Sequence, residues 1–118
     1  MSLFDELKNL GVNVDEGMGR LMGNASLYEK MLGKFAKMIR DSSVKSEDFD
    51  CEDCTELIEK THAIKGASGN LSVTPVYAAY TEIVDLLRSN QPEQAKIVFD
   101  KNLSVQDDII ACIENHMQ

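Results

Sequence analysis

Apolar residues recur at every third or fourth position along most of the chain, which is the spacing of one face of an α-helix. Four segments keep this pattern over a long stretch: residues 25–41, 51–70, 75–89 and 92–116. In the first of them the repeating positions are Leu27, Tyr28, Met31, Leu32, Phe35, Met38 and Ile39. No segment shows the strict apolar–polar alternation of a half-buried strand. We therefore predict four long amphipathic helices.

Residues that favour helix starts support these limits. Asn24 stands where the first long helix needs an N-cap, and Asp53 places negative charge in the predicted first turn of the second. Thr74 and Pro75 predict a cap followed by proline at the first helical position of the third helix. Pro92 predicts the start of the last and longest helix in the same way.

Shorter helical segments precede the long ones. Residues 3–10 are amphipathic, and Gly11 ends this stretch. Asn13 predicts the cap of a second short helix, which Gly17 and Gly19 weaken because each glycine costs about 1 kcal/mol relative to alanine in a helix.

The lengths of the connections predict how the helices are arranged. Residues 42–50 are polar and acidic and are predicted to form a loop, and the other links are short. Short links force neighbouring helices to run antiparallel. We therefore predict a single all-α domain over residues 1–118, an antiparallel up-down-up-down four-helix bundle with the one or two short N-terminal helices capping one end.

Composition and charge narrow the range of functions. The 118 residues include 12 Lys and Arg against 20 Asp and Glu, giving a formal net charge of −8. General nucleic-acid binding needs clustered Lys and Arg, so it is not expected. No apolar run approaches the length that spans a bilayer, and the first residues lack the basic start and apolar stretch of a secretory signal. We expect a cytoplasmic protein with no membrane partner.

The cysteines allow a metal-site hypothesis that the predicted fold argues against. Three cysteines are few and odd in number, which is typical of a reduced protein. The spacings Cys51-x₂-Cys54 and Cys112-x₃-His116 mimic a zinc set. In an antiparallel bundle, however, the start of the second long helix and the end of the last one lie at opposite ends. We therefore expect no metal site, with Cys54 and Cys112 as small residues in or near the core.

One histidine lies beside the apolar stripe of the 51–70 helix and not on it. With about 100° per residue and Leu57 at zero, the apolar residues fill an arc from roughly −40° to about 100°, whereas His62 falls at roughly 140°. Gly66 and Gly69 lie on the same side of the helix, one and two turns beyond His62. We predict that His62 is exposed and that the glycines leave a lane through which another molecule can approach the ring.

These residue types suit the carriage of a phosphoryl group. A neutral imidazole is a nucleophile near pH 7, and histidine can form covalent intermediates. Lys65, three residues after His62, can attract phosphoryl oxygens. Donor and acceptor then need little more than an in-line approach. The alternative is an ordinary surface histidine beside glycines that serve helix packing.

The same segment resembles a known signature. Histidine-containing phosphotransfer (HPt) domains have a similar run, with Lys at +3 and Gly at +4 after the histidine; here the run is His62-Ala63-Ile64-Lys65-Gly66-Ala67-Ser68-Gly69-Asn70-Leu71. Upstream, Gly11–Gly17 and Asn24–Tyr28 also resemble the N-terminal helices of that family, so the similarity covers nearly the whole chain.

The resemblance implies a function. Members of the family are four-helix bundles that carry a phosphoryl group on that histidine between aspartates of receiver domains in two-component signalling. It implies that His62 is phosphorylated, with Lys65, Gly66 and Gly69 in supporting roles. The chain has no ATP-binding motif, so we expect a monomeric phosphocarrier and not an enzyme. It needs no cofactor of its own, because Mg²⁺ should belong to the partner receiver.

Two positions depart from the family pattern. Ser72 stands where the family often has Gly ten residues after the histidine, and Val84 stands where many members have a Gln that bonds the imidazole. These departures leave open a scaffold bundle that binds receivers without accepting phosphate. A fragment of a larger sensor or chemotaxis kinase is a further alternative with the same chemistry.

The weak N-terminal region offers a candidate docking surface. Met18 and Met22, with Phe4 and Leu7, could form an exposed apolar patch near the functional end. Receiver domains dock on such patches in the family that the chain resembles.

Overall fold

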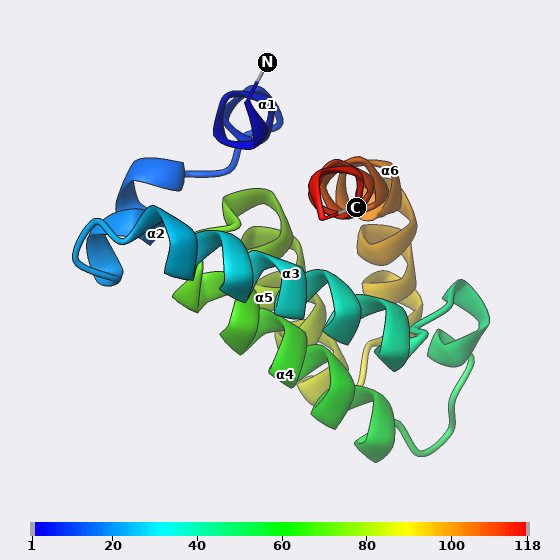
Figure 1. Ribbon diagram of the computed structural model, residues 1–118. Helices are drawn as coiled ribbons and strands as arrows, with labels where there is room; N and C mark the ends of the chain where they lie inside the picture. The colour runs from blue at the N-terminus through cyan, green and yellow to red at the C-terminus, as the bar shows by residue number, and fades with distance from the viewer. Residues whose placement is uncertain (1, 118) are drawn as a thin grey trace.

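The computed structural model describes residues 2–117, and all the regular structure in this part of the chain is helical (Figure 1). The elements are α1 (Leu3–Asn9), α2 (Val14–Arg20), α3 (Ala25–Ser42), the 3₁₀ helix η1 (Ser46–Phe49), α4 (Thr55–Asn70), α5 (Thr74–Arg88) and α6 (Pro92–His116). The predicted all-helical class is confirmed. None of the helices described between residues 2 and 117 has both the length and the apolar character needed to cross a membrane.

Side-chain caps fix the starts of α2 and α3. The Asn13 Oδ1 accepts a hydrogen bond from the Glu16 N–H at 3.2 Å, and the Asn24 Oδ1 accepts one from the Leu27 N–H at 3.0 Å. Both predicted caps are confirmed. Each satisfies one of the backbone donors that the first turn of a helix leaves without a partner.

The two proline starts differ. Pro92 begins α6 as predicted, but α5 begins one residue earlier than expected, at Thr74, with Val73 in the N-cap position. Thr74 is therefore not the cap. Its hydroxyl donates to the Ser72 carbonyl at 3.2 Å, and Pro75 sits in the first turn, where a missing N–H costs nothing.

The start of α4 is also corrected. The predicted helix from residue 51 begins only at Thr55, because a disulfide between Cys51 and Cys54 holds the preceding residues in a turn. Asp53 precedes the helix, and its carboxylate accepts bonds from the Thr55 N–H and hydroxyl at 3.0 and 2.6 Å. The expectation that the cysteines are reduced is wrong for this pair, and Cys112 is the free thiol.

The segment predicted as a loop contains η1. Its last residue, Phe49, is buried and packs against Phe99 of α6, with ring centroids 5.1 Å apart. Lys96 of α6 also binds the Asp50 carboxylate at 3.0 Å. These contacts attach the link between α3 and α4 to the first half of α6.

The long helices pack around one apolar core. Connections of three residues, 71–73 and 89–91, join α4 to α5 and α5 to α6. In Figure 1, α3 and α4 run side by side across the view, whereas the C-terminal end of α6 is seen nearly end-on. Arg40, near the end of α3, binds Glu114, near the end of α6, with its Nη2 2.8 Å from Oε1. The end of α6 therefore lies across α3.

The N-terminal helix is part of the core. Leu7 is fully buried, so the predicted exposed patch cannot include it. Phe4 is half-buried and contacts the Tyr28 ring, with centroids 5.8 Å apart. Of the four patch residues, Met22 alone is almost fully exposed, at 97%. The patch as predicted is therefore wrong.

A close backbone approach joins α2 to the end of α4. The buried Tyr28 hydroxyl donates to the Leu71 carbonyl at 2.7 Å, and burial raises the pKa of Tyr28 to about 12. A Cβ at Gly17 would lie 2.6 Å from the Tyr28 ring and 2.7 Å from the Leu71 oxygen. Gly17 is thus required by packing, because any larger residue would push α2 away from α4.

Two glycines of α2 provide a matched test of this contact. Replacing Gly17→Ala should lower the free energy of unfolding by about 2 kcal/mol, since overpacking outweighs the gain in helix propensity. Gly19→Ala, whose Cβ would meet nothing within 4 Å, should raise it by up to about 1 kcal/mol. Urea unfolding measures both. Equal effects of the two substitutions would contradict the packing role of Gly17.

Candidate functional site

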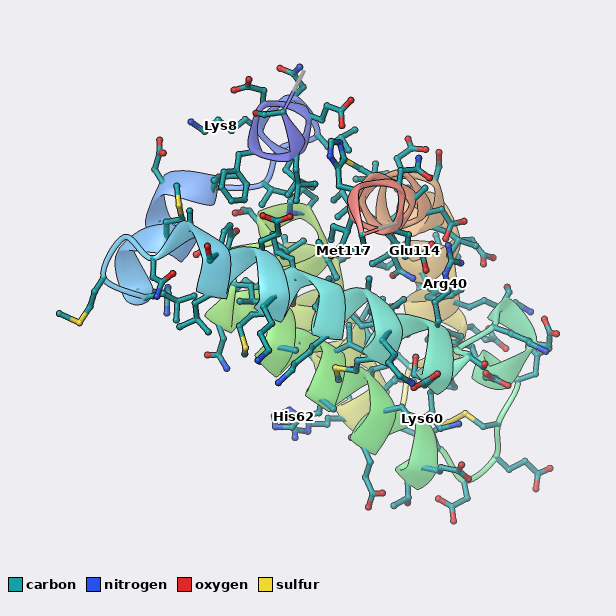
Figure 2. All side chains as sticks on the ribbon, viewed as in Figure 1. Lys8, Arg40, Lys60, His62, Glu114 and Met117 are labelled. Atoms are coloured by element: carbon teal, nitrogen blue, oxygen red, sulfur yellow. A yellow bond between two sulfur atoms is a disulfide. The ribbon has the colours of Figure 1, made fainter. Side chains whose placement is uncertain are left out.

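The α4 helix divides its residues between a core face and a solvent face. Leu57, Thr61, Ile64 and Ser68 are buried along one side. His62 is exposed, and in Figure 2 its side chain projects away from α4 toward solvent. The predicted exposure of the imidazole is confirmed. It follows from the helical period, because the core claims the neighbouring stripe.

The two glycines beyond His62 have different surroundings. A Cβ built on Gly66 would meet nothing within 4 Å, so the surface one turn from the imidazole is open. A Cβ on Gly69 would lie 2.8 Å from a ring carbon of Tyr77 on α5. The surface at Gly66 is therefore open, as the predicted lane requires, whereas the absent side chain at Gly69 makes room for the Tyr77 ring.

A hollow of about 490 Å³ lies beside the histidine. The α4 helix contributes His62, Lys65 and Gly66 to its lining, and α2 contributes Glu16 and Arg20. The turn after α4 and the start of α5 also contribute to it. The hollow is open to solvent, so a group attached to the imidazole would be accessible to a second protein.

Of the two positively charged side chains that line this hollow, Arg20 has a carboxylate partner and Lys65 has none among the residues that the structure describes. Arg20 pairs with Glu16, with Nη2 3.4 Å from Oε1, and both side chains are about half exposed. Lys65 is half-buried, and within residues 2–117 no carboxylate oxygen lies within 4.0 Å of its ammonium. Lys65 is therefore available to an incoming anion from its position one turn after His62.

Ser72, in the turn after α4, lines the hollow and contacts α2. Its φ is +56°, the left-handed region that favours glycine, and its hydroxyl donates to the Glu16 Oε1 at 2.7 Å. Its carbonyl accepts from the Asn13 N–H at 3.0 Å. The Ser72 hydroxyl, followed by Arg20, holds the pKa of Glu16 below its usual value of 4.5. Serine thus occupies a backbone conformation suited to glycine and ties α2 to the end of α4.

Val84, the other position that differs from the HPt pattern, lies in the core and not at the site. Val84 is fully buried in α5 and does not line the hollow. Within residues 2–117, no side chain hydrogen-bonds the His62 ring. The imidazole nitrogens are therefore open to solvent, and one of them can act as a nucleophile when neutral.

Several contacts of the site were not anticipated, although Ser72 had been singled out from the sequence. The roles of Glu16, Arg20, Ser72 and Tyr77 depend on contacts between α2, the turn after α4 and α5. The i,i+4 spacing of Glu16 and Arg20 was a visible local signal for their pairing. No local signal placed either residue near His62, because they lie more than forty positions away in sequence.

Within residues 2–117, the four members of the zinc-like set do not lie together. Cys51 and Cys54 are joined to each other before α4, whereas Cys112 and His116 lie beside Glu6 of α1. Within the described part of the chain, the one group of three potential metal ligands is Glu6, Cys112 and His116. His62 is not part of it.

Comparisons with protein-family models, with curated proteins and with solved structures give no match.

Ser72 can be tested with two substitutions that both remove its hydroxyl. Ser72→Ala keeps a side chain in the left-handed conformation, whereas Ser72→Gly removes that strain. The glycine variant should be more stable than the alanine variant by about 1 kcal/mol in urea unfolding. Equal stabilities would mean that the backbone at residue 72 relaxes without cost.

The same variants should change the response to acid. Because the pKa of Glu16 is lowered in the folded protein, Glu16 stabilises the fold above its usual pKa of 4.5. That contribution is lost as the pH falls through the lowered folded value. Both Ser72 variants should raise the pKa of Glu16 in a carbon-13 NMR titration and weaken this acid-induced loss. An unchanged Glu16 pKa would contradict the role of the hydroxyl.

Proposed function

We propose that this protein carries a phosphoryl group on His62 between aspartates of receiver domains. The observation that carries the proposal is an exposed imidazole without internal hydrogen bonds, next to open surface at Gly66 and an unpaired Lys65. The sequence resemblance to HPt domains supplies the class of partner.

The chemistry needs few groups from this chain. A lone pair on a neutral nitrogen of His62 attacks phosphorus of the receiver's phosphoaspartate, so that the N–P bond forms as the bond to the aspartyl oxygen breaks. The aspartate carboxylate leaves with the electron pair. Lys65 attracts the phosphoryl oxygens during the transfer. The return step to a second receiver reverses these roles, and Mg²⁺ belongs to the receiver.

The proposal also includes the arrangement of the helices and the oligomeric state of the protein. A four-helix up-down bundle suits this role, because a rigid helix positions the imidazole and leaves its outer side free. We propose that the protein acts as a monomer beside receiver domains and that it does not phosphorylate itself from ATP.

The histidine assignment has a matched control, because the chain contains two histidines. After mixing with a phosphorylated receiver, wild type and His116→Gln should acquire base-stable, acid-labile label, whereas His62→Gln should show only background. Circular dichroism should confirm that both variants are folded. If wild type binds the receiver and never acquires label, the protein is a receiver-binding scaffold. Equal labelling of His62→Gln would show that the acceptor is another residue.

The open surface at Gly66 is tested by adding bulk beside the imidazole. Gly66→Leu should leave the helical signal unchanged and slow transfer by at least about tenfold, since a misplaced approach is costly in phosphoryl transfer. Ala63→Leu adds bulk at an exposed position of α4 that does not line the hollow, and should transfer at the wild-type rate. Wild-type transfer by Gly66→Leu would show that the open surface is unimportant.

A further inference from the structure

Three potential metal ligands meet where the two ends of the chain come together. Glu6 is on α1, and Cys112 and His116 are on consecutive turns of α6. In Figure 1 the C-terminal end of α6 lies near α1. The His116 Nε2 lies 2.7 Å from the Glu6 Oε2, and the Cys112 Sγ lies 3.5 Å from the same oxygen. All three ligand atoms are within 4.8 Å of one another.

We propose that Glu6, Cys112 and His116 form a site for a divalent transition-metal ion, with Zn²⁺ as the favoured ion. Sulfur, imidazole nitrogen and carboxylate oxygen are the three donor types that zinc takes in proteins. An i,i+4 pair on a helix presents two of them on one face, and α1 supplies the third. Ca²⁺ and Mg²⁺ are disfavoured because they require oxygen ligands.

The distances fit this assignment with a small adjustment. Tetrahedral zinc, with bonds of about 2.3 Å to sulfur and about 2.0 Å to oxygen, needs a sulfur–oxygen separation of roughly 3.5 Å. The Cys112–Glu6 separation already has this value. The nitrogen–oxygen separation must open from 2.7 Å to roughly 3.3 Å. Binding replaces the His116–Glu6 hydrogen bond with two metal bonds. The His116 Nε2 gives up its proton, so that the neutral ring keeps its N–H at Nδ1, and the thiol proton is released to solvent.

The three ligands border open space that water can enter. A hollow of about 390 Å³ borders Glu6 and Cys112, and Asp108 lines it one turn before Cys112. Glu6 and Cys112 are half-buried and His116 is exposed, so an ion can enter from solvent. Water can complete the coordination.

The site would act as a clamp between the ends of the chain. Glu6 and Cys112 are separated by 106 positions, and the bound ion would tie α1 to α6. The proposal differs from the expectation of no metal site. That expectation concerned a set in which Cys51 and Cys54 joined Cys112 and His116, and it did not include Glu6. It is independent of the proposed role of His62.

Co²⁺ is a suitable probe because a cobalt–thiolate bond gives a charge-transfer band in the near ultraviolet. Under non-reducing conditions Cys112 is the free thiol, so the band reports on this site. Wild type and His62→Gln should both show it, and Zn²⁺ should displace Co²⁺ and abolish it. Cys112→Ser should lose the band, and Glu6→Gln and His116→Gln should weaken Co²⁺ binding by at least about tenfold.

Thermal unfolding provides a second measurement. Zn²⁺ at about a hundred times its dissociation constant should raise the Tm of wild type by on the order of 10 °C. The Tm of Cys112→Ser should not respond. A Cys51→Ser/Cys54→Ser double variant should behave as wild type, which excludes binding by that pair. The proposal is overturned if wild type gives no band, or if Zn²⁺ stabilises Cys112→Ser as much as wild type.

Discussion

The site depends on how closely α2 approaches the end of α4. Gly17 allows the approach, because a Cβ there would overlap both the Tyr28 ring and the Leu71 carbonyl oxygen. The Tyr28 hydroxyl then satisfies that buried carbonyl, which would otherwise be costly to leave without a donor. This contact holds α2 where Glu16 and Arg20 line the same hollow as His62.

The turn after α4 holds α2 in place beside the hollow. Ser72 adopts a left-handed backbone conformation and binds Glu16 through its hydroxyl and Asn13 through its carbonyl. Glu16 in turn pairs with Arg20, which leaves Lys65 as the cation without a carboxylate partner beside the imidazole. The same contacts that stabilise the end of α4 therefore determine which charge faces an incoming group.

The sequence was informative where the signal is local. The helical period placed His62 outside the core face, and Asn13 and Asn24 marked helix starts, because these features depend on residues within one or two turns. The predicted start of α4 was too early. The apolar spacing of the helix extends back to Cys54, but the Cys51–Cys54 disulfide keeps residues 51–54 out of the helix. Phe49, a lone aromatic in a polar segment, showed no period that indicated its contact with Phe99. Gly66 and Gly69 looked alike in sequence, and only the position of Tyr77 on another helix distinguishes them.

The location of the phosphoryl group on the unmodified protein tests the central claim most directly. After incubation with a phosphorylated receiver, the wild-type chain can be digested at alkaline pH and mapped by tandem mass spectrometry. We predict phosphate on the peptide that contains His62 and none on the peptide that contains His116, whose ring is bound to Glu6. Phosphate on His116, or on neither histidine while the receiver loses its label to this protein, would contradict the account.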